Sequence, residues 1–155
     1  MKANELLKDV KKTYERKGIQ IESESGKAYT IQMETKFKET KIIEIVDGLV
    51  ERSVMCTKEG MKFDTTMCLY ALMLKQFTDI EFSKFNQLKR QYAHEVEMLK
   101  AVIDMGLFTQ IMNVFEPEEM KKIEGVFEQY KASFKAIHNE VIAQKVMRGE
   151  EDGDL

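Results

Sequence analysis

The sequence predicts a mainly α-helical fold, a bundle of about five helices with one small β-hairpin near the N-terminus. Apolar residues recur at spacings of three and four along most of the 155 residues, and only one short segment alternates apolar with polar positions. A chain of this length is typical of one domain. We expect a single helical domain over residues 1–148 and a disordered acidic tail over 149–155, where Glu and Asp replace apolar residues.

The first helix is expected over residues 5–17. Asn4 is a residue type that caps helix N-termini, and Leu7, Val10 and Tyr14 then recur at helical spacing. Gly18 stands where a left-handed residue often ends a helix.

Residues 19–34 have the pattern of a β-hairpin. Ile19 and Ile21 alternate with polar residues, a polar turn follows over 23–27, and alternation resumes through Ile31 and Met33. Two strands alone are marginally stable in water, so the hairpin must lie on the helices or add its edge to another chain. This edge is the first candidate interaction surface.

Two helices are expected in the middle of the chain. An apolar stripe from about Thr40 to Val54 indicates the first, and residues 57–60 interrupt it. Asp64 then precedes the unbroken apolar run 67–74, whose periodicity fits a central helix or a buried strand. We favour a helix because the run contains Ala, Leu and Met and follows a capping residue.

The C-terminal half predicts further helices. Ser83 is placed to cap one of them, Gly106 to bend or break it, and Pro117 to occupy the first position of the last. The last helix carries a heptad seam: Met120, Ile123, Phe127, Tyr130, Phe134, Ile137 and Val141. Three aromatic residues are bulky for a two-stranded coil, so packing within a bundle is favoured over a free coiled-coil dimer.

Composition restricts the partners and the compartment. The formal net charge of −3 makes nucleic-acid binding unlikely, although the basic residues of segment 8–17 form a local exception. No stretch is apolar enough to span a membrane and the N-terminus is charged, so we expect a cytoplasmic protein. Cys56 and Cys68 lack metal-site or redox spacing and are expected to be free, buried thiols.

The sequence contains no recognisable catalytic or metal-binding motif. His94-Glu95 begins like a zinc-protease motif, but Met98 occupies the position of the second histidine. Neither His94 nor His138 has a glutamate three residues ahead of it, as paired carboxylate-bridged iron sites require. No phosphate-binding loop or nucleophile elbow is present. We therefore expect no enzyme, no metal and no cofactor.

The 11 methionines allow two interpretations. Methionine is unbranched and adapts to irregular surfaces, so an exposed methionine-rich groove accepts varied partner helices. Filling of the core is the more common use, and the accessibility of the side chains separates the two.

The order of features resembles a family of small helical proteins. A short leading helix, the segment 29–34 (YTIQME) running into an Ile/Val-rich helix, the segment 70–82 (YALMLKQFTDIEF) and a final charged helix are similar to tail assembly chaperones of tailed bacteriophages and prophages. The resemblance covers about residues 29–147. It implies a non-enzymatic role in virion assembly, in which the chain binds tape measure and tail tube proteins and keeps them soluble.

For such a role we expect a partner-binding groove between the methionine-rich central helix and the heptad helix. Its predicted walls are Met67, Leu74, Phe108, Met112, Phe127 and Phe134. Two alternatives remain: a head–tail connector or minor structural protein, and a small regulatory protein that binds host nucleic acid or protein. A homo-oligomer is compatible with each of them.

Overall fold

A computed structural model describes residues 1–149 and shows a helical fold with an N-terminal antiparallel hairpin, which confirms the predicted fold class. The elements are α1 (Ala3–Thr13), β1 (Arg16–Glu22), β2 (Ala28–Glu34), α2 (Glu39–Glu59), α3 (Thr65–Phe77), α4 (Leu88–Asp104), α5 (Phe108–Val114) and α6 (Pro117–Met147). Among the described residues, no helix has both the length and the apolar character to cross a bilayer.

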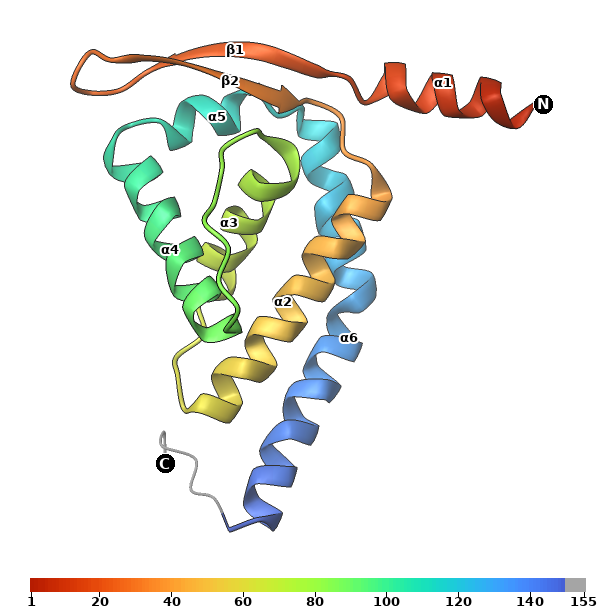
Figure 1. Ribbon diagram of the computed structural model, residues 1–155. Coiled ribbons are helices and arrows are strands. Elements are labelled where there is room, and N and C mark those ends of the chain that lie inside the picture. The colour runs from red at the N-terminus through yellow and green to blue at the C-terminus, as the bar shows by residue number, and fades with distance from the viewer. Residues whose placement is uncertain (150–155) are drawn as a thin grey trace.

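Helices α2 and α6 lie side by side and run in the same direction (Figure 1). Near their N-terminal ends, the Phe37 amide donates to Glu119 Oε1 at 2.8 Å. Near their C-terminal ends, Lys145 Nζ donates to the Thr57 carbonyl. Helix α2 also contacts α3 and α4, so it is the element around which the other long helices pack.

The hairpin lies across one end of these helices, with α5 beneath it (Figure 1). Ile21, Ile31 and Met33 point into the same core as the helices. Phe37, just after β2, stacks on Phe77 with ring centroids 3.9 Å apart, and Phe115 meets Phe37 edge-on at 4.9 Å. This aromatic cluster joins the hairpin end to α3 and to the start of α6.

Several local predictions are confirmed. Asp64 caps α3, accepting from the Met67 amide at 3.0 Å, and the apolar run is a helix. Gly106 separates α4 from α5 with φ +75°, and Pro117 opens α6. Cys56 and Cys68 are free and buried.

Four helix-boundary predictions are wrong, and one of them is the break expected over residues 57–60, because α2 continues to Glu59 and Gly60 is its C-cap. The first helix ends at Thr13, so Gly18 lies inside β1 opposite Gln32 rather than at a helix end. Asn4 is within α1, whose N-cap is Lys2. Ser83 caps no helix, because side chains from α4 bind its backbone and hold residues 83–87 off the helix, which begins at Leu88.

The methionines divide between core and surface. Met33 and Met73 are fully buried, whereas Met67 and Met112 are partly buried against the core. In the heptad seam, Met120, Ile123 and Phe127 also pack on this core. The side chains of Tyr130, Phe134, Ile137 and Val141, and residues 150–155 of the predicted disordered tail 149–155, lie outside the described residues.

Candidate functional site

The N-terminal arm, residues 1–14, extends away from the helical body (Figure 1). None of the residues of α1 is buried, and Leu6 and Leu7 are 49% and 67% exposed. Val10 and Tyr14 continue the same apolar stripe at spacings of three and four residues. The arm therefore presents an apolar face that is exposed at Leu6 and Leu7 and partly buried at Val10 and Tyr14, where Lys38 Nζ lies 5.9 Å from the Tyr14 ring centroid.

Tyr14 connects this stripe to an apolar cleft in the body. The cleft has a volume of about 320 Å³ and lies where α2 and α6 begin. Its lining residues are Tyr14, Phe37, Glu39, Ile42, Lys122, Gly125, Val126 and Gln129. An amphipathic segment lying along α1 would reach the cleft with its next apolar side chain.

Glu119 holds the polar groups at the rim of the cleft in place through hydrogen bonds. Its Oε1 accepts from the Phe37 amide and from Lys122 Nζ, each at 2.8 Å. Burial opposes ionisation of this carboxyl, but the hydrogen bonds from Lys122 and Phe37 outweigh it and lower the pKa of Glu119. Beside it, Gly125 leaves open space, since a Cβ built there meets no atom within 4 Å.

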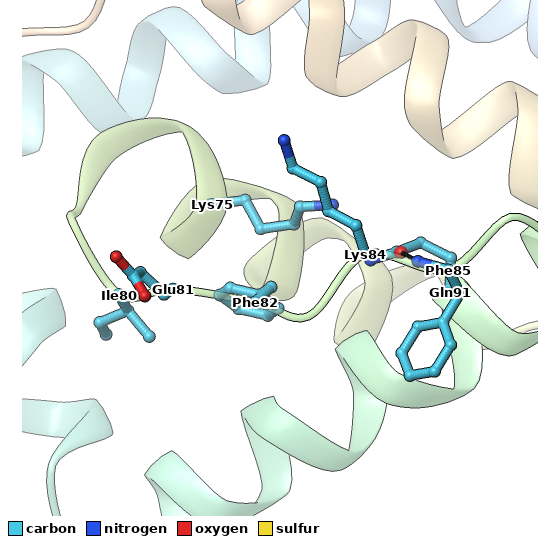
Figure 2. A pocket seen from close by; sticks show the side chains of 7 residues that line it. All are labelled: Lys75, Ile80, Glu81, Phe82, Lys84, Phe85 and Gln91. Atoms are coloured by element: carbon cyan, nitrogen blue, oxygen red, sulfur yellow. Dashed lines mark hydrogen bonds between the residues drawn. The ribbon is translucent and has the colours of Figure 1, made fainter.

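A second pocket lies between α3, α4 and the connecting segment 78–87. Figure 2 shows Ile80 and Glu81 at one end of its lining and Phe85 at the other, with Phe82 between them. Its volume is about 740 Å³, and Lys75, Lys84 and Gln91 complete the lining. The lining combines the Lys84 amine and the Glu81 carboxylate with two aromatic rings, while the Lys75 amine is held by Glu95 Oε2 at 2.6 Å.

A buried ion-pair network lies behind this pocket. Glu95 on α4 is fully buried, and its carboxylate accepts from Arg52 Nε at 2.6 Å and from an Arg52 terminal nitrogen at 2.8 Å. Lys75 Nζ donates to Glu95 Oε2 at 2.6 Å, and Gln91 Nε2 donates to the same oxygen at 3.3 Å. The network joins α2, α3 and α4.

The electrostatics of the network favour a permanent ion pair. Burial disfavours the Glu95 carboxylate, but hydrogen bonds from Arg52 and Lys75 more than compensate and lower the pKa of Glu95. Burial likewise opposes the charge of Arg52, and Glu95 reverses that effect, so the pKa of Arg52 is raised. The Glu95 carboxylate accepts four hydrogen bonds, and through them it holds the three helices together.

Other reactive residue types near the pocket also have structural partners. Burial raises the pKa of Cys68 to about 12, which keeps it a thiol. His94 Nε2 accepts from the Ser83 amide at 2.9 Å, so this side chain holds the segment that precedes α4. Among the side chains that the structure describes, His, Cys, Asp and Glu form no group of three that could hold a metal ion.

The structure separates the residues of the predicted groove. Helix α6 packs along α2 rather than along α3, and Leu74 is fully buried in the core instead of lining a wall. Met67 lies at the rim of a third pocket with Phe63, while Phe108 packs edge-on against Tyr70 at 5.2 Å. Met112 and Phe127 pack against the core from α5 and α6, and the side chain of Phe134 is not described. Their role in partner binding stays a prediction.

Sequence reasoning missed the buried network, although a signal for it exists. Glu95 is three residues after Tyr92 and four before Leu99, which places it on the apolar face of its helix. Arg52 is likewise three residues after Leu49 and four before Cys56, so it also lies on the apolar face of its helix. Two opposite charges, each in line with an apolar stripe, indicate a buried pair.

A family model described as YomO matches residues 3–152. The chain belongs to the YomO family. The YomO match takes in the N-terminal arm together with the helical body, so both are parts of the family's unit. No curated protein and no solved structure matches the chain significantly.

Proposed function

We propose that this YomO-family protein is a non-enzymatic virion assembly protein, a tail assembly chaperone that binds tape measure and tail tube proteins. The family resemblance of segments 29–34 and 70–82 suggests the role. The observation that carries it is the uncovered apolar stripe of α1, which leads through Tyr14 into the cleft between α2 and α6. An amphipathic helix of a client would bury this stripe.

This proposal moves the client surface from the predicted groove to the N-terminal arm. Leu6 and Leu7 already lie in solvent, so a client buries their apolar area without any rearrangement of the core. Each leucine buried at such a contact contributes about 1.5–3 kcal/mol before the cost of association is subtracted. Lys8 and Lys12 on the exposed sides of α1 suit a client helix with acidic flanks.

Co-expression with the tape measure protein of the same gene cluster tests the proposal. We expect the chain to increase the soluble fraction of the tape measure protein and to co-purify with it. Replacing Leu6 and Leu7 with Ser should abolish both effects while the thermal unfolding midpoint stays unchanged. Equal solubility of the tape measure protein with and without this chain would contradict the proposal.

A second variant tests the cleft separately from the arm. Gly125→Leu places a side chain in the open space of the cleft, and a leucine is also more favourable than glycine within a helix. We expect weaker client binding with an equal or higher unfolding midpoint. Gly125→Ala is the matched control, because it gives the helix-propensity gain and leaves most of the cleft open. Client binding by Gly125→Leu at the level of Gly125→Ala would exclude the cleft from the client surface.

A further inference from the structure

The outer edge of β1 is free for part of its length. In the hairpin, Ile19 is opposite Ile31, and Gly18 is opposite Gln32. The Gln32 amide points away from β1 and donates to Asp79 Oδ1 at 2.8 Å, so Gly18 and Gln32 form a pair that exchanges no backbone hydrogen bonds. By the same alternation, the amides and carbonyls of Gly18 and Gln20 point outward from the edge of β1.

The other edges of the hairpin are occupied. Asp79 and a bridge between Met33 and Thr78 cover part of the outer edge of β2. At the end of β1, the Gln110 side chain bonds both backbone groups of Glu22, its Oε1 accepting at 3.1 Å and its Nε2 donating at 2.7 Å. No hydrogen bond within residues 1–149 occupies the outward groups of Gly18 and Gln20, and both residues are exposed.

The sequence of β1 is complementary to itself in one antiparallel register. If two strands pair about Ile19, the outward groups of Gly18 meet those of Gln20 in the other copy, which forms four backbone hydrogen bonds. In this register Arg16 of each copy lies opposite Glu22 of the other copy, so the dimer has two such pairs. Arg16 and Glu22 are exposed and oppositely charged, and Arg16 also contacts Glu34 of its own hairpin at 3.5 Å. This register is therefore favoured over one that aligns like charges.

From this geometry we infer that β1 is a dimerisation edge, and that its partner is a second copy of this chain paired antiparallel about Ile19. The two hairpins then form one four-stranded sheet. Because the copies run in opposite directions, the two α1 helices lie at opposite ends of this sheet, and each keeps its apolar stripe. The Gln110 contact ends the pairing at Glu22 and limits it to the centre of the strand.

Cysteine cross-linking tests the register. In the proposed dimer the two Ile19 residues face each other as a non-hydrogen-bonded pair, with Cα atoms about 4.5 Å apart, within the range of a disulfide. Lys17 is the matched control: it lies on the same strand face, but its two copies would be about 14 Å apart. We expect Ile19→Cys to form a covalent dimer under mild oxidation and Lys17→Cys to stay monomeric on a denaturing gel. Cys56 and Cys68 are buried and remain in both variants.

Molecular mass in solution tests the edge itself. Sedimentation equilibrium over a concentration series should give a monomer–dimer equilibrium for the wild type. Gln20→Pro removes an outward N–H without removing a hydrogen bond of the hairpin, and should weaken the dimer at least about tenfold. Gln20→Thr retains this N–H and should dimerise like the wild type.

A charge exchange tests the register, and the unfolding midpoint of each variant is measured beside it because Arg16 Nε also lies 3.5 Å from Glu34 Oε1 in its own hairpin. Arg16→Glu and Glu22→Arg should each weaken the dimer, whereas the double variant should restore it. The two positions are six residues apart in one strand and are too distant to pair within one copy. A one-chain mass at every concentration, a double variant no tighter than its parents, or cross-linking of Lys17→Cys as fast as Ile19→Cys would overturn the inference.

Discussion

The helical body and the N-terminal arm of this protein differ in how completely they are packed. In the body, even a charged side chain such as Glu95 is fully buried and satisfied by Arg52, Lys75 and Gln91. In the arm, Leu6 and Leu7 lie in solvent. The side chains of the body pack on one another and stabilise the fold. The exposed apolar side chains of the arm are available for contact with another molecule. This difference locates the proposed function in the arm.

A large effect is expected from breaking the ion-pair network of the body. Glu95→Gln removes the negative charge and leaves Arg52 and Lys75 without a counter-ion, so the unfolding free energy should fall by about 3 kcal/mol. Urea denaturation followed by circular dichroism measures it. Glu97→Gln, on the exposed side of the same helix, is the control and should change stability by less than about 0.5 kcal/mol. Equal effects of the two variants would mean that the network does not stabilise the body.

A pair of leucine variants compares the two regions directly. Leu74→Ala empties a fully buried position and should cost about 2–5 kcal/mol. Leu7→Ala in the arm, where the side chain is 67% exposed, should cost less than about 0.5 kcal/mol. The same denaturation experiment measures both. A large loss for Leu7→Ala would show that α1 packs on the body in solution.

Acidification should weaken the body through Glu95. Its pKa in the fold is below the ordinary value of 4.5, so its contribution to stability is present above pH 4.5 and is lost as the pH falls through the lowered value. Unfolding free energy measured at decreasing pH should therefore fall more steeply for the wild type than for Glu95→Gln. Parallel slopes for the two proteins would contradict the lowered pKa.

A small gain in stability is expected at Gly125, where α6 borders the cleft. Gly125→Ala should raise the unfolding free energy by up to about 1 kcal/mol, because alanine is favoured in a helix and a Cβ there meets no atom within 4 Å. A shift of the thermal unfolding midpoint measures the gain. A decrease would mean that the cleft is narrower in solution than in the structure.

Local signals in the sequence predicted most of the element order. Asp64, Gly106 and Pro117 act through their own backbone or side chain on adjacent residues, so their effect is readable without the rest of the fold. Gly18 was misjudged because a glycine near a helix end has the same local appearance as a glycine within an edge strand. The prediction that Ser83 caps a helix is wrong for another reason. The side chains of Gln91 and His94, eight and eleven residues later, bind its backbone.

The candidate site depended on long-range packing and was harder to predict. The predicted groove assumed that the central helix and the heptad helix are neighbours, but α6 packs along α2. Periodicity shows which face of a helix is apolar and says nothing about which partner covers it. The exposure of Leu6 and Leu7 could not be predicted from the sequence either, because the apolar stripe of α1 has the same spacing as a stripe that packs on a core.

Hydrogen exchange of the backbone amides tests the contrast between the arm and the body most directly. An 11-residue helix with no buried residue is marginally stable in water, so the amides of α1 should exchange at nearly the rate of an unstructured peptide, even where the copies pair through β1. The amides of α3 should be protected to the level of global unfolding. Protection of α1 equal to that of α3 in the chain alone would show that the arm is already covered, and would contradict its proposed role.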